Sequence, residues 1–156
     1  SRGSLVQLIF NETTIINAPI GVVRSSILNV ESWSKWNNSC KSAEFIHGSM
    51  GKPGSKLAMR VSLFPFPIYS STIFTIIKSL TNTNNEMIWE GKKLGVYGIH
   101  KWQLDEITPS KTRMQSLETL SGNTLIFLGF LGIKFIVKKL NNKWSNGIKN
   151  ASEESF

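Results

Sequence analysis

The hydrophobic and polar positions of this chain follow a period of two through its middle. In the clearest stretch, Leu57, Met59 and Val61 alternate with Lys56 and Arg60. Because successive side chains of a strand point to opposite faces, this alternation predicts a half-buried strand. Turn-rich segments divide the region into six strands, at residues 43–48, 56–63, 71–79, 87–92, 97–107 and 111–120. Strands at this spacing predict an antiparallel meander.

A further strand and two short helices are expected before the meander. Residues 5–17 are rich in β-branched and large apolar side chains, which favours a long first strand. Pro19 ends this strand and suits the first turn of a helix, which we expect over residues 20–28. A second short helix is expected over residues 32–37, where two tryptophans three positions apart lie on one side.

The C-terminal part changes to a helical period. Apolar residues recur there at intervals of three and four, at Ile133, Ile136, Val137, Leu140, Trp144 and Ile148. This spacing predicts a long amphipathic helix with one buried face. Residues 125–132 precede it, are apolar nearly all round and include two glycines. Together with the helix they are too interrupted to span a bilayer, which needs ~20 apolar residues. We expect them to be the buried N-terminal part of the helix, with a mobile flap as the alternative.

Two ionisable residues fall on faces of the meander that are otherwise apolar. His100 alternates with Trp102, and Glu118 alternates with Met114 and Leu120. A polar group on an apolar face needs a partner or a ligand, because burial without a hydrogen bond is costly. The pattern therefore indicates a pocket into which His100 and Glu118 point.

Length and cysteine usage indicate one domain. The chain has 156 residues, and we assign residues 5–150 to a single ligand-binding domain. Residues 1–4 resemble a cloning remnant, and residues 151–156 are expected to form a tail. Cys40 is the single cysteine, and no charged-then-apolar leader opens the chain, so a cytoplasmic location is expected. The sequence makes no prediction of the oligomeric state.

The net charge of +8 raises the question of an anionic partner. The lysines are scattered, and no helix-turn-helix, zinc-ligand or RNA-binding pattern accompanies them, so no nucleic-acid partner is expected. A solvated basic surface is the simpler interpretation, with weak contact to anionic membranes as the alternative. Two histidines and one cysteine predict no metal site, and no phosphate-binding glycine loop precedes a helix. No cofactor is therefore expected.

Several short segments then occur in the order typical of one family. They are Ile16-Asn17-Ala18-Pro19, Trp33-Ser34-Lys35-Trp36-Asn37, Gly51-Lys52-Pro53-Gly54-Ser55, Trp89-Glu90-Gly91, Gly98 with His100, and Thr112 with Glu118 and Gly122. In this order they resemble the START-like (SRPBCC) superfamily, in particular its polyketide cyclase/dehydrase group, from about Val6 to Ile148.

The resemblance implies an α+β helix-grip fold. In this fold a curved seven-stranded antiparallel sheet wraps around a long C-terminal helix, with two short helices after the first strand. The resemblance also implies a cavity between sheet and helix that takes apolar molecules. The family includes lipid and sterol carriers, hormone receptors and polyketide cyclases, so the fold implies a pocket and not a reaction.

The candidate ligand-binding residues follow from the pocket and the resemblance together. They are His100, Glu118, Trp89, Trp102, Met59, Leu57, Met114, Trp36, Phe127 and Phe130. The apolar ones are expected in the cavity wall, with Trp36 near its mouth; plain core packing is the alternative for each. The apolar loop at residues 64–67 is expected either to gate the cavity or contact a membrane, or to pack on the sheet.

Three roles remain open for the polar pair. His100 and Glu118 either satisfy each other or a buried water, orient a ligand, or perform acid–base chemistry with Glu118 as base and His100 as acid. We expect a carrier or sensor of an apolar or amphipathic small molecule or lipid. The alternative is a cyclase- or dehydratase-like enzyme that uses both residues. A peripheral membrane lipid-transfer protein is the second alternative.

Overall fold

The computed structural model describes residues 6–63 and 66–156, without the side chain of residue 130. In that part of the chain the strands are β1 (Gln7–Ile16), β2 (Cys40–His47), β3 (Lys56–Ser62), β4 (Tyr69–Lys78), β5 (Glu86–Lys93), β6 (Val96–Thr108) and β7 (Lys111–Ser121). The helices α1 (Ile20–Leu28) and α2 (Trp33–Trp36) follow β1, and α3 (Leu125–Phe130) and α4 (Ile133–Glu154) follow β7.

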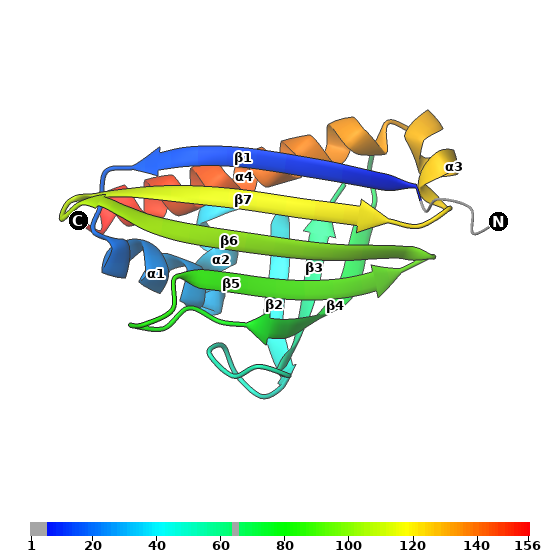
Figure 1. Cartoon of the computed structure of the whole chain (residues 1–156). Coiled ribbons are helices and arrows are strands. Elements are labelled where there is room, and N and C mark those ends of the chain that lie inside the picture. The colour runs from blue at the N-terminus through cyan, green and yellow to red at the C-terminus, as the bar shows by residue number, and fades with distance from the viewer. Residues whose placement is uncertain (1–5, 64–65) are drawn as a thin grey trace.

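The seven strands form one antiparallel sheet in the order β1-β7-β6-β5-β4-β3-β2. The segment with α1 and α2 connects the two edge strands, β1 and β2. Figure 1 shows β2, β3 and β4 at a steep angle to β5, β6, β7 and β1, so the sheet is strongly curved. Helix α4 runs along its inner face and shares a cavity lining with β3 to β7. The predicted α+β helix-grip architecture is confirmed.

A cluster of tryptophans joins the sheet to the helices. The ring of Trp33, in α2, lies 5.4 Å from Trp89 of β5 and 5.0 Å from Trp144 of α4, both edge to face. Trp89 also contacts Trp102 of β6, with ring centroids 5.0 Å apart. Edge-to-face packing is a favoured geometry for aromatic pairs. The cluster therefore fixes α4 against the sheet at the deep end of the cavity described below.

The segment before α4 differs from our expectation. Residues 125–132 are not the buried N-terminal part of the long helix, because Gly132 adopts a φ of +76° and separates α3 from α4. Leu125 is buried, but Phe127 is 73% exposed and Leu131 is 65% exposed. A short helix with apolar side chains all round can bury only one side, so the others face solvent.

The C-terminal end of α4 extends further than expected. Residues 151–154, which were expected to belong to a tail, continue the helix. Ser152 is fully buried there and its hydroxyl donates to Ser26 Oγ of α1 over 3.0 Å. Residues 1–4 and the first two residues of the 64–67 loop lie outside the described residues. Among the described residues, no helix has both the length and the apolar content needed to cross a membrane.

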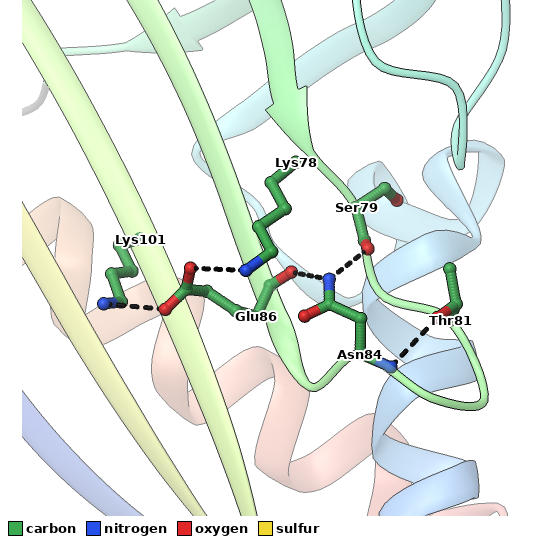
Figure 2. Close-up of polar contacts among 6 residues, drawn as sticks. All are labelled: Lys78, Ser79, Thr81, Asn84, Glu86 and Lys101. Atoms are coloured by element: carbon green, nitrogen blue, oxygen red, sulfur yellow. Dashed lines mark hydrogen bonds and ion pairs between the residues drawn. The ribbon is translucent and has the colours of Figure 1, made fainter.

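Polar contacts hold the β4–β5 hairpin at the end remote from α3. The Asn84 side-chain amide donates to the Ser79 carbonyl over 2.7 Å and to the Glu86 carbonyl over 2.8 Å (Figure 2). The Glu86 carboxylate then pairs with Lys101 of β6 at 2.7 Å and with Lys78 of β4 at 3.1 Å (Figure 2). One carboxylate on β5 thus ties together three neighbouring strands.

Candidate ligand-binding site

Two glycines on the inner face of the sheet line a cavity of this protein. Gly91 of β5 lies directly opposite Gly98 of β6. His100 faces inward, and the period of two therefore turns Gly98 inward as well. Phe74 and Leu120 continue the same row on the outer sides of the glycines. At this pair of positions neither β5 nor β6 has a side chain, so the space between the sheet and α4 is not filled there.

The space under these glycines is a cavity of about 240 Å³ between the sheet and α4. Its deep end consists of buried residues, among them Met59, Trp89 and Trp102. Its wall on the helix side includes Val137, Leu140, Asn141 and Trp144. Towards the other end the lining includes Leu63, Ser70, Lys93 and Val96, which are partly or fully exposed. The cavity therefore opens between the β3–β4 connection, the β5–β6 turn and the first half of α4.

His100 and Glu118 meet inside this cavity. They are directly opposite each other on β6 and β7, and both line it. His100 Nδ1 lies 3.5 Å from Glu118 Oε2, and His100 Nε2 shares a hydrogen bond of 2.9 Å with Ser116 Oγ. The side chain of His100 is 8% exposed and that of Glu118 is 20% exposed. Both ring nitrogens of His100 are thus engaged, while Glu118 keeps carboxylate surface towards the cavity.

Two further residues of the lining have polar side-chain groups without a hydrogen-bond partner among the described residues. The Trp102 Nε1 donor is buried without a hydrogen bond among the described residues. Asn141 of α4 is 6% exposed, and its side-chain amide makes no hydrogen bond in the same part of the chain. A fully buried donor without a partner, such as Trp102 Nε1, is uncommon because it costs free energy to desolvate. The polar atoms of the Asn141 amide are not fully buried, so this amide can hydrogen-bond a molecule that enters the cavity.

The structure brings some of the sequence-derived candidates together and separates others. His100, Glu118, Trp89, Trp102 and Met59 line the cavity. The remaining described candidates, namely Leu57, Met114, Trp36 and Phe127, do not belong to this lining. The side chain of Phe130 lies outside the described residues.

The physical reasons for these absences differ. Leu57 and Met114 are fully buried in the hydrophobic core. Trp36 packs edge to face on Trp144, with ring centroids 5.5 Å apart, instead of standing at the mouth. Phe127 projects from α3 into solvent.

Sequence reasoning missed Ser116, Asn141 and the glycine pair. Ser116 could have been found, because it alternates with Met114 and Glu118 and so shares their face. Asn141 also carried a signal, since it follows Val137 by four residues and precedes Trp144 by three, on the buried side of α4. The pairing of Gly91 with Gly98 depends on strand register, which the sequence leaves undetermined.

A second, polar cavity of about 250 Å³ lies between β1 and α4. Asn141 lines both cavities, while Ser116 of β7 and Glu12 of β1 line this one. Ser145 Oγ donates to Glu12 Oε2 over 3.3 Å. With its amide turned to donate, Asn142 Nδ2 lies 2.9 and 3.2 Å from the two Glu12 oxygens. Among the described residues, no three histidine, cysteine or acidic side chains gather as a metal site requires.

Comparison with known proteins gives matches of structure and not of sequence. No protein-family profile and no curated protein sequence matches the chain. An aromatase/cyclase from Streptomyces is similar in structure, with a TM-score of 0.77 and 10% identity over 95% of this chain and 94% of the other. Norcoclaurine synthase from Thalictrum flavum, in complex with dopamine and hydroxybenzaldehyde, gives a TM-score of 0.74 and 14% identity over 98% and 90%.

A START superfamily protein from Mycobacterium smegmatis is also similar, with a TM-score of 0.66 and 14% identity over 94% of this chain and 95% of that one. At identities this low, the similarity shows a shared fold and does not show that the activities are shared. The three matches cover nearly the whole chain, from the first strand to the last helix. The chain therefore has the START-like helix-grip fold.

Proposed function

We propose that this protein binds an apolar or amphipathic small molecule in the cavity under Gly91 and Gly98 and acts as its carrier or sensor. The observation that carries the proposal is the unfilled space at the glycine pair, beside the polar pair of His100 and Glu118. A mostly apolar wall with a few polar groups is the usual composition of a small-molecule site.

The size of the cavity limits the ligand. A cavity of ~150 Å³ lined by apolar side chains is enough for benzene. The 240 Å³ here suits a larger body, such as two fused rings or one end of a lipid chain. Burial of apolar surface contributes ~25 cal/mol per Å², before the cost of ordering the ligand. Glu118, which His100 contacts, and Asn141 would orient a hydroxyl or carbonyl group on such a molecule.

Naphthol tests this proposal, because it has two fused rings and one hydroxyl. Isothermal titration calorimetry should detect binding to the parent protein. Gly98→Val should reduce the affinity about tenfold or more, because its side chain would occupy the space that the ligand needs. A Cβ at Gly98 would meet the end of the Leu120 side chain at 3.1 Å and the Gly91 carbonyl oxygen at 3.9 Å, an ordinary contact, so the fold should accept the change.

Gly21→Val is the matched control, since nothing lies within 4 Å of a Cβ added at Gly21 on α1. It should bind naphthol as the parent does. Equal binding by the parent and by Gly98→Val would contradict the proposal, as would no binding by either protein.

An enzyme that removes a proton next to a carbonyl is the second candidate. It is favoured by one observation: His100 Nδ1 lies 3.5 Å from the Glu118 carboxylate, and a hydrogen bond to Ser116 orients the His100 ring. Glu118 would act as the base. Tetralone, a bicyclic ketone, reports this chemistry through deuterium exchange at the carbon beside its carbonyl.

Nuclear magnetic resonance measures the tetralone exchange directly. An enzyme should accelerate it and lose about 10²-fold of the rate on Glu118→Gln, with binding retained. A carrier should bind tetralone without acceleration in either form. A peripheral lipid-transfer role would require, besides the cavity, a surface that docks on a membrane.

A further inference from the structure

Large apolar side chains gather in solvent at one end of the molecule. We call this group the mouth patch, and it consists of Leu94, Ile126, Phe127, Leu131 and Phe135, each more than half exposed. Single exposed apolar residues are ordinary, but a group of this kind indicates an interaction surface. None of the five lines either of the two cavities described above.

Separate segments bring the mouth patch together. Leu94 lies in the β5–β6 turn, and the others belong to α3, the residue after it and the first turn of α4. The turn packs closely on the start of α3, since a Cβ at Gly95 would meet Thr124 Oγ1 at 2.6 Å. Figure 1 shows α3 at the end of the sheet where β5 ends and β6 begins.

The mouth patch also lies beside the opening of the ligand cavity. Lys93 and Val96 flank Leu94 in sequence and line that cavity, and Leu120 lines it from the end of β7 that leads into α3. A molecule that leaves the cavity at this end therefore emerges next to exposed apolar side chains.

Positive charge surrounds the mouth patch. Lys92 and Lys93 precede Leu94, while Lys134 and Lys138 are exposed on α4. Lys139 Nζ lies 5.8 Å from the centre of the Phe135 ring. The residues between Glu118 and Glu153 include five lysines and no acidic residue. Those between Glu90 and Asp105 include three lysines and no acidic residue. The segments that carry the patch thus contain no acidic residue of their own, although Glu12 of β1 lines the polar cavity together with Lys134 and Lys138.

We propose that the mouth patch and its lysines dock this protein on an anionic lipid membrane, with the cavity opening turned towards the lipid. Apolar side chains on a turn and a short helix protrude and do not line a groove, so they suit insertion into a deformable layer. Lysines around them suit the phosphate and carboxylate groups of the lipid surface. The proposal concerns the surface alone and does not depend on which molecule the cavity holds.

Sedimentation with vesicles tests the docking. The protein should bind vesicles of phosphatidylcholine and phosphatidylserine at low salt, and bind pure phosphatidylcholine much more weakly. Phe127→Ser should lower the affinity about tenfold, because one large apolar side chain no longer enters the layer. Lys134→Ala and Lys138→Ala should each lower it about fivefold and reduce its salt dependence.

Matched controls separate docking from general adsorption of a basic protein. Ile73→Ser removes an equally apolar side chain, 53% exposed, from β4, and Lys111→Ala removes an exposed lysine from the hairpin at the other end of the sheet. Both should bind vesicles as the parent does, and so should Gly98→Val. Equal losses in patch and control variants would overturn the proposal, as would a failure to bind anionic vesicles, which would favour a protein partner for the patch.

Discussion

Gly147 of α4 lies directly beneath the indole ring of Trp36. A Cβ added at Gly147 would overlap the six-membered ring of Trp36 and approach the Trp36 carbonyl oxygen to 3.1 Å. Trp36 packs edge to face on Trp144 in the neighbouring turn of the same helix. The glycine therefore gives up helix propensity so that α2 can approach α4 closely.

Gly147→Ala should destabilise the protein by about 1–2 kcal/mol. Overpacking a tight contact costs ~1–3 kcal/mol, which exceeds the gain of up to ~1 kcal/mol that alanine brings to a helix interior. Chemical denaturation measures the free energy of unfolding. Gly129→Ala is the matched control, because nothing lies within 4 Å of a Cβ added at Gly129 in α3. It should be neutral or slightly stabilising, and a Gly147→Ala protein as stable as the parent would contradict the packing.

The sequence predicted the sheet because its signals are local. Alternation with a period of two placed His100 and Glu118 on one inner face, and they lie opposite each other there. The same alternation could not separate Met59, which lines the cavity, from Leu57, which is two residues away and lies in the core. Whether an inward-facing side chain touches a cavity depends on what covers it from other elements.

The pattern of hydrophobic and polar residues could not predict features that depend on backbone conformation. Residues 125–132 are apolar nearly all round, so their pattern does not show where a helix begins, but Gly132 takes a left-handed conformation and separates α3 from α4. A glycine is equally compatible with a helix interior and with such a break, so composition alone does not decide. Phe127, which was expected to contact ligand, lies on α3 before this break and is exposed.

Cys40 should react slowly with thiol reagents in the native protein. It is 2% exposed, and burial raises the pKa of its thiol to about 11. At neutral pH only ~10⁻⁴ of it is the reactive thiolate. Absorbance on adding Ellman's reagent should therefore show slow labelling that accelerates sharply in denaturant. In a Cys40→Ser background, Ser49→Cys places a thiol at an exposed turn and should react at once. Fast native labelling of Cys40 would contradict its burial.

Glu86 should stabilise the fold at neutral pH and lose this effect in acid. Hydrogen bonds from Lys101 and then Lys78 hold the pKa of Glu86 below its ordinary value. Because the folded-state pKa is the lower one, its contribution is complete above the unfolded-state pKa, near 4.3, and disappears as pH falls through the folded-state pKa. Glu86→Gln should lower stability by about 0.5–1 kcal/mol at neutral pH, since partly exposed ion pairs are weak.

Thermal unfolding measured across the acidic range checks this prediction. The difference between the parent and Glu86→Gln should shrink as pH falls below the pKa of a free glutamate. Glu44→Gln provides the comparison, because Glu44 is exposed and makes no ion pair with a described residue. A difference that stayed constant with pH would show that Glu86 acts through its shape and not through its charge.

Asn141 offers a test that separates stability from binding. Its side-chain amide stands in the cavity wall without a hydrogen-bond partner among the described residues, and its polar atoms are not fully buried. Asn141→Leu should therefore change the free energy of unfolding by less than about 1 kcal/mol, because it breaks no hydrogen bond among the described residues. The same substitution removes a group that would hydrogen-bond a ligand hydroxyl.

Calorimetry with naphthol and naphthalene measures the effect of Asn141→Leu on ligand binding. The affinity for naphthol should fall about fivefold to tenfold, because a hydrogen bond contributes ~1 kcal/mol, while the affinity for naphthalene should not fall. Asn84→Leu is the control for a partnered amide: it breaks two hydrogen bonds in the β4–β5 hairpin and should destabilise without changing either affinity. Destabilisation by Asn141→Leu, with naphthol affinity unchanged, would mean that Asn141 supports the fold and does not recognise the ligand.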